Sequence, residues 1–84
     1  MASRRSVFPG FAEIADRRVR MISDLVRARQ RLGLSQTDVA ARMGTSQSAV
    51  ARLESGDADV RLSTLERYAA ALDSQLDWKL RKER

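Results

Sequence analysis

The 84-residue sequence contains no cysteine and no histidine. The missing cysteines exclude a disulfide framework and a thiolate metal site. The missing histidines remove the commonest general base and the commonest metal ligand. Serines, carboxylates and basic residues are present, but none of them cluster at the spacing of a nucleophile and its base. The composition therefore predicts a chain that is not an enzyme and that needs no metal and no cofactor.

Long apolar runs are also missing, since none approaches the roughly 20 residues that cross a bilayer. The N-terminus carries Arg4 and Arg5 without the apolar core of a signal peptide. We therefore expect a cytoplasmic protein with no membrane partner. The length suits one small domain with a modest core.

The chain is basic, with a net charge of +5 at pH 7, and 14 of its 16 basic residues are arginine. A positive balance favours a polyanionic partner, and arginine suits bidentate contacts to phosphate and guanine. Arginine and alanine enrichment is equally typical of a GC-rich genome, so the charge alone does not identify the partner.

Residues 35–55 have the spacing of two short helices joined by a tight turn. Ser35 is a good N-cap, and Asp38 can complete a capping box with it. Gly44 suits a left-handed helix end, and Ser46 can cap the second helix. Their joint spacing predicts a helix-turn-helix unit, with an ordinary helical hairpin as the alternative. The positions expected to face inward are Val39, Ala40, Met43, Val50 and Leu53.

A long first helix is predicted over residues 11–32, where apolar residues recur at three- and four-residue steps without proline or glycine. Its part up to Val19 has no obvious partner in so short a chain. We therefore assign Phe11 and Ile14 to a dimer or partner surface. The alternative is that this segment folds back over the C-terminal end.

Arg29 falls on the inner side of this helix, in step with Ile22 and Leu25. A buried arginine needs a partner, and Glu54 at the end of the second short helix is the candidate. We predict a structural ion pair between Arg29 and Glu54. The alternative is that both side chains point to solvent.

The C-terminal part divides into a helix and a tail. Apolar residues from Leu62 to Leu72 predict an amphipathic helix. Leu76, Trp78 and Leu80 then alternate with polar residues, which predicts a short strand over residues 75–81. A lone strand has no partner in a helical chain, so we expect it to pair with the same strand of a second copy. The alternative is an extended tail that covers the core.

The predicted organisation is thus all-α. Residues 1–9 form a flexible basic tail, residues 10–73 the helix-turn-helix domain, and residues 74–84 a strand or tail that serves as a dimerisation element.

The outward side of the second short helix carries side chains that match base edges in the major groove. Glutamine can bind adenine and arginine can bind guanine through two hydrogen bonds each, serine can bond several edges, and alanine can touch a thymine methyl. The predicted base-contacting residues are Gln47, Ser48, Ala51 and Arg52. The predicted phosphate-contacting residues are Gln36, Arg42, Ser46, Arg61 and Ser63.

The unit itself is not basic, because residues 32–61 hold three basic and four acidic side chains. One copy should therefore bind weakly, and we expect a homodimer on double-stranded DNA with two half-sites about one helical turn apart.

A resemblance follows from two segments of the sequence. R-x-R-L-G-L-S-Q-T-D-V-A-A-R-M-G-T-S-Q-S-A-V-A-R-L-E-S-G and, after it, L-S-T-L-x-R-Y-A-A-A-L resemble the Cro/C1-type helix-turn-helix family of phage repressors and bacterial regulators. The resemblance implies a domain of four to five helices, a recognition helix at residues 47–54, and binding to a palindromic operator as a dimer. It also implies a phosphate contact at Gln36 and base contacts at Gln47, Ser48 and Arg52. Two departures, Thr45 in the turn and Arg61 before the last helix, leave the fold intact.

The flanks resemble single-domain antitoxins of the host-inhibition-of-growth type. Members of that group bind their own promoter and mask a toxin ribonuclease. The sequence thus favours a transcriptional repressor, with a toxin-neutralising antitoxin that represses its own operon as the alternative.

Overall fold

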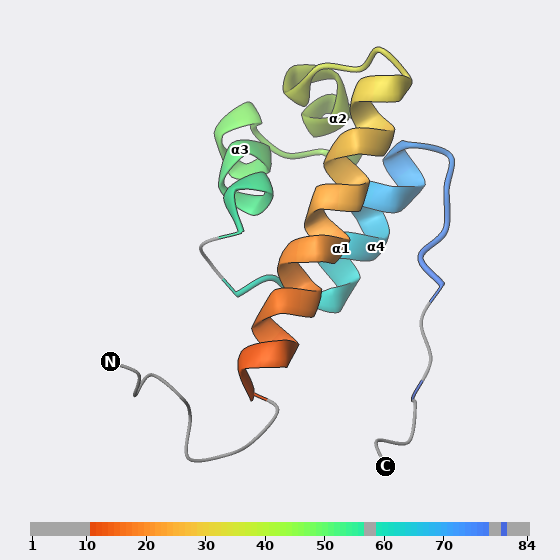
Figure 1. Cartoon of the computed structure of the whole chain (residues 1–84). Helices are drawn as coiled ribbons and strands as arrows, with labels where there is room; N and C mark the ends of the chain where they lie inside the picture. Colours follow the sequence, from red (N-terminus) through yellow and green to blue (C-terminus); the bar gives the residue numbers. More distant parts are fainter. Residues whose placement is uncertain (1–10, 57–58, 78–79, 81–84) are drawn as a thin grey trace.

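Four α-helices make up the computed structural model, which describes residues 11–56, 59–77 and 80 (Figure 1). They are α1 (Phe11–Arg31), α2 (Gln36–Met43), α3 (Gln47–Ser55) and α4 (Leu62–Ala71). The described residues contain no strand, so the all-α prediction is confirmed. None of the helices in the described ranges is long and apolar enough to cross a membrane.

The first helix runs past the rest of the domain. Its C-terminal half packs against α3 and α4, and Ile22 and Leu25 are buried there. Its N-terminal half leaves Ile14 53 % exposed and Val19 50 % exposed. The amphipathic pattern predicted both the helix and the excess of apolar surface at its start.

Capping fixes where α2 begins and ends. The amide of Asp38 donates to Ser35 Oγ at 3.0 Å, and the amide of Ser35 donates to Asp38 Oδ2 at 2.8 Å. The amide of Ser35, and after it the hydroxyl of Ser35, hold the pKa of the Asp38 carboxyl below its usual value by hydrogen bonding. Gly44 ends the helix with φ 73° and ψ 36°, the left-handed conformation that glycine adopts without steric cost. The predicted capping box and turn are confirmed.

The third helix starts at the predicted cap, because the amide of Ala49 donates to Ser46 Oγ at 3.1 Å. Val50 and Leu53 on its inner side are both buried. The third helix therefore presents one apolar side to the domain and leaves its other side free.

The core draws on all four helices, and α4 lies alongside α1 in Figure 1. Tyr68 has no exposed surface and is among the largest fully buried side chains. Burial of this size is the main stabilising contribution to a small domain. The buried apolar residues are Ile22, Leu25, Val39, Ala40, Met43, Val50, Leu53, Leu65, Tyr68, Ala69, Ala71 and Leu72.

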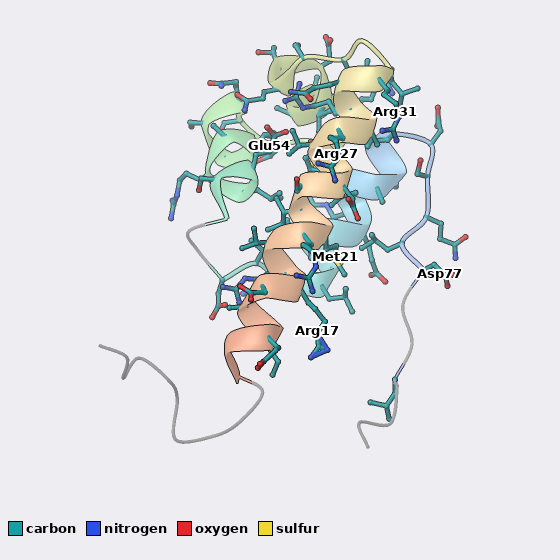
Figure 2. All side chains as sticks on the ribbon, in the orientation of Figure 1. Arg17, Met21, Arg27, Arg31, Glu54 and Asp77 are labelled. Carbon is teal, nitrogen blue, oxygen red and sulfur yellow. The ribbon has the colours of Figure 1, made fainter. Side chains whose placement is uncertain are left out.

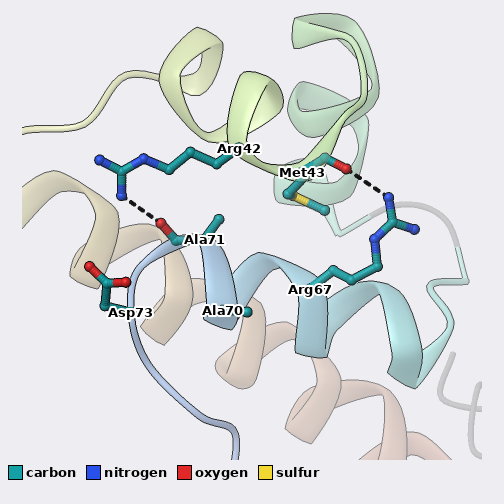
Figure 3. Close-up of a pocket in the computed structure, with 6 residues that line it drawn as sticks. All are labelled: Arg42, Met43, Arg67, Ala70, Ala71 and Asp73. Carbon is teal, nitrogen blue, oxygen red and sulfur yellow. Dashed lines mark hydrogen bonds between the residues drawn. The ribbon is translucent and has the colours of Figure 1, made fainter.

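Two arginines join α2 to α4 by crossing between them (Figure 3). Arg42 Nη1 donates to the carbonyl oxygen of Ala71 at 2.7 Å, at the C-terminus of α4. Arg67 Nη2 donates to the carbonyl oxygen of Met43 at 2.8 Å, at the C-terminus of α2. Each guanidinium thus donates to a carbonyl at the C-terminus of the other helix, where that carbonyl has no intrahelical partner.

The predicted C-terminal strand is not formed by residues 74–77 and 80. A strand needs a ladder partner, and the described residues of one copy offer none. Leu76 is half-buried and packs against the core, as the alternative of a covering tail expected, whereas Leu80 is exposed. Residues 1–10, Trp78 and the side chain of Phe11 lie outside the described part of the chain.

Candidate nucleic-acid interface

The outward side of α3 carries the residues that the sequence assigned to base contacts. Gln47, Ser48 and Arg52 are exposed, and Ala51 between them is half-buried. Val50 and Leu53 occupy the opposite side and are buried. A short helix with one side fixed to the core and polar side chains on the other has the form that a major groove admits.

A carboxylate holds α3 in this orientation. Glu54 lies between α3 and α1 in Figure 2, and its side chain is 8 % exposed. Arg29 Nε donates to Glu54 Oε2 at 2.8 Å, and Arg29 Nη2 donates to Oε1 at 3.1 Å. The third nitrogen of the guanidinium, Nη1, donates to the carbonyl oxygen of Leu34 at 2.8 Å. The predicted Arg29–Glu54 ion pair is therefore present, with the bidentate geometry that makes such pairs strong.

Two further donors complete the environment of this carboxylate. Tyr68 of α4 donates its hydroxyl hydrogen to Glu54 Oε2 at 2.5 Å, and Gln36 of α2 donates from Nε2 to Oε1 at 2.9 Å. Glu54 therefore receives donors from α1, α2 and α4 while it belongs to α3. We call this set of four residues, Arg29, Gln36, Glu54 and Tyr68, the Glu54 cluster.

The sequence did not predict that Tyr68 belongs to the Glu54 cluster. Its position in the apolar stripe of α4 indicated only that it lies in the core. A usable signal was present, because a buried tyrosine hydroxyl requires a hydrogen-bond partner. Among nearby side chains the carboxylate of Glu54 is the acceptor.

The Glu54 cluster favours the ionised carboxylate. Burial alone would raise the pKa of Glu54, but the hydrogen bonds from Arg29, Tyr68 and Gln36 outweigh it and lower that pKa below its usual value. The bond to Glu54 raises the pKa of Arg29. Burial, and then the bond to Glu54, raises the pKa of Tyr68. All three groups thus keep their ordinary neutral-pH states: the arginine charged, the tyrosine protonated and the glutamate ionised.

The ionised carboxylate also fixes the direction of the amides beside it. A carboxylate has no hydrogen to donate, so Gln36 must turn its nitrogen toward Glu54. Its oxygen Oε1 then faces α3 and accepts from Gln47 Nε2 at 2.6 Å. The Gln47 amide is left with a second N–H and with its oxygen. A donor and an acceptor side by side are what the N7 and N6 edge of adenine binds.

A second group of candidates gathers where α3 meets α4. Arg52 and Arg61 line one surface pocket of about 330 Å³, together with Thr64 and the carboxylate residue Asp59. The pocket therefore joins a predicted base contact to a predicted phosphate contact. Arg61 occupies the N-cap position of α4 without a side-chain capping bond.

The other candidates lie apart from one another. Ser46 is exposed at the start of α3, within 3.2 Å of Ser48 through their hydroxyl oxygens. Ser63 is exposed in the first turn of α4. Arg42 is drawn to the C-terminus of α4 by its bond to Ala71, because that helix end offers an unpaired carbonyl. Arg42 is exposed, and this bond uses only one of its guanidinium nitrogens.

Comparison with known proteins identifies a protein family that the chain matches. A family model described as helix-turn-helix matches residues 25–79, which include α2, α3 and α4 in full. No solved structure matches the chain significantly.

Three curated relatives are informative. The protein named Antitoxin HigA1, from Mycobacterium tuberculosis, is 44 % identical over 69 residues, which cover 82 % of this chain and 46 % of that protein. The protein named Putative antitoxin HigA3, from the same species, is 50 % identical over 54 residues, covering 62 % of this chain and 50 % of that protein. A protein of Haemophilus influenzae named as an HTH-type transcriptional regulator is 37 % identical over 59 residues, covering 70 % of this chain and 60 % of that protein. The chain spans about half the length of the curated relatives it matches.

The Glu54 cluster predicts a defined response to acid. Because the pKa of Glu54 is lower in the folded state than in the unfolded chain, its stabilisation is complete above the ordinary pKa of 4.5. The stabilisation falls as the pH drops from that value through the folded pKa. Glu54→Gln should lower the free energy of unfolding by about 3 kcal/mol at pH 7, and the gap to the native protein should narrow below pH 4.5.

Urea unfolding from pH 7 to pH 3 measures this gap. Glu66→Gln removes an exposed carboxylate from α4 and serves as the matched control, for which we expect no such gap. Tyr68→Phe removes one donor and should show the same trend with a smaller loss. A gap that stays constant with pH for Glu54→Gln would contradict the role given to the ionised carboxylate.

Proposed function

This chain belongs to the helix-turn-helix family, and we propose that it is a sequence-specific DNA-binding transcriptional repressor that places α3 in the major groove. The observation that carries the proposal is the two-sided character of α3. Val50 and Leu53 attach it to the core, while Gln47 and Arg52 face outward. We infer binding rather than catalysis as the task of this chain.

The base contacts follow from the outward side chains. The second N–H and the oxygen of the Gln47 amide suit adenine, because Gln36 already takes the first N–H. Arg52 suits guanine O6 and N7, while Ser48 and Ala51 complete the contacted surface. Each bidentate pair discriminates against a wrong base by about 1–3 kcal/mol.

The proposed phosphate contacts come mainly from residues near the starts of α2, α3 and α4. Gln36 Nε2 carries a second hydrogen beyond the one given to Glu54, so the same amide can also donate to a phosphate oxygen. Arg61, Ser46 and Ser63 are exposed at the starts of α4 and α3 and can donate there as well. Arg42 gives one nitrogen to Ala71, and its other N–H groups can also donate to a phosphate oxygen.

Two copies of the chain bind one operator in this proposal. A single α3 offers few base contacts, and residues 32–61 hold more acidic than basic side chains, so one copy binds weakly. A palindromic site with half-sites one helical turn apart lets two copies add their contacts. The C-terminal segment from Gln75 onward, with Trp78 and Leu80, stays the proposed pairing element between the copies.

Base and phosphate contacts have different consequences when they are removed. Arg52→Ala should weaken binding to the preferred duplex at least tenfold and weaken binding to random DNA much less. Arg61→Ala, at a proposed phosphate contact, should weaken both to a similar degree. Fluorescence anisotropy with both duplexes at one fixed salt concentration measures the two affinities. Equal losses on both duplexes for Arg52→Ala would refute its role in reading bases.

A second function, that of an antitoxin, is favoured by two observations. Two of the relatives carry the word antitoxin in their names. The start of α1 exposes Ile14, on the part of the helix that extends past the core. We propose that this surface holds a toxin, and that the same chain represses its own operon.

Co-expression with a toxin encoded beside this chain tests the antitoxin proposal. The variant Ile14→Arg should lose the toxin in affinity purification while it still binds DNA. Leu32→Arg introduces the same charge at another exposed apolar residue and should retain the toxin. Equal recovery of the toxin with both variants would remove this surface from the proposal.

A further inference from the structure

A carboxylate lies beside the arginines of the candidate interface. Asp59, in the connection between α3 and α4, lines the same surface pocket as Arg52 and Arg61. Its side chain is 95 % exposed. A negative charge in that position would repel the phosphates that Arg61 is proposed to attract.

The carboxylate of Asp59 pairs with an arginine in the N-terminal half of α1. Arg18 Nη1 donates to Asp59 Oδ1 at 3.1 Å, and the side chain of Arg18 is 32 % exposed. Its neighbour Val19 approaches the end of α3, since a Cβ at Gly56 would lie 3.8 Å from Val19 Cγ2. This turn of α1 therefore lies against the connection that carries Asp59.

The pair is a poor stabiliser of the fold. An ion pair with one fully solvated partner contributes about 0–1 kcal/mol. Arg18 Nε, moreover, is buried and has no hydrogen-bond partner within the described ranges, and such a buried donor costs about 1–3 kcal/mol. Folding alone therefore gives little reason for this arginine to lie where it does.

We infer that Arg18 sets the affinity for DNA without contacting it, by holding the carboxylate of Asp59 against α1 and away from the DNA phosphates. The inference rests on the proposed function. Arg18 is a positioning residue in this account, and the group it acts on is the carboxylate of Asp59. The start of α1 thereby takes part in DNA binding, although it lies outside the helix-turn-helix unit.

Four proteins test the inference: the native chain, Arg18→Ala, Asp59→Asn and the variant with both changes. Their affinities for the preferred duplex are measured by fluorescence anisotropy at 50 mM and 200 mM salt. Arg18→Ala should weaken binding about fourfold at the lower salt, and Asp59→Asn should strengthen it by a similar factor. In the Asp59→Asn background, Arg18→Ala should change the affinity less than twofold, because no carboxylate is left for Arg18 to hold.

Matched controls separate this mechanism from a change in net charge. Arg20→Ala removes an exposed arginine from the same helix, and Asp77→Asn removes an exposed carboxylate from the C-terminal segment. Each should change the affinity less than twofold. Thermal unfolding of every variant shows that the fold is retained, and Asp59→Asn tests the inference without altering α1.

Two outcomes would overturn the inference while the native chain still binds its duplex. An equal loss from Arg18→Ala in both backgrounds would mean that Arg18 acts on the DNA through its own charge and not through Asp59. An equal loss from Arg18→Ala and Arg20→Ala would leave only net charge. Failure of the native chain to prefer any duplex would instead remove the proposed function, and the inference with it.

Discussion

The structure depends on one ionised carboxylate. Glu54 belongs to α3, and it receives donors from Arg29 of α1, Gln36 of α2 and Tyr68 of α4. An ionised group in so enclosed a place is tolerated only when its oxygens are fully hydrogen-bonded. The same requirement fixes α3 relative to the other three helices, because moving any one of them would take a hydrogen-bond donor away from a buried charge. Apolar contacts bring α3 to the domain, and the Glu54 cluster sets its orientation.

The direction of the hydrogen bonds links the buried carboxylate to a side chain on the exposed side of α3. The carboxylate can only accept, so Gln36 donates to it, and Gln36 in turn accepts from Gln47. The side chain proposed to read a base is thus oriented by a buried charge two hydrogen bonds away. At the other edge of the interface, Arg18 acts on Asp59 through its charge rather than through contact with DNA. The core and the first helix therefore both shape a surface that α3 presents.

Local chemistry made much of this predictable. The capping pattern from Ser35 to Gly44 gave the helix-turn-helix unit, because caps depend on neighbours three or four residues apart. The partner of Glu54 on α1 could also be predicted, since a buried arginine demands one. The role of Tyr68 and the bond of Arg42 to the end of α4 depend on how distant helices pack, and no local spacing encodes that. The C-terminal strand was predicted from alternation and was expected to pair with a second copy, and residues 74–77 and 80 form no strand in the single chain.

Selection of DNA from random duplexes by the native chain tests the central claim most directly. The account predicts an enriched site with two inverted half-sites about one helical turn apart, and with adenine and guanine at fixed positions in each. The same selection with Glu54→Gln should give a weaker and less defined site, because Gln47 is no longer oriented. Enrichment of no sequence by the native chain, or of the same sharp site by both proteins, would contradict the account.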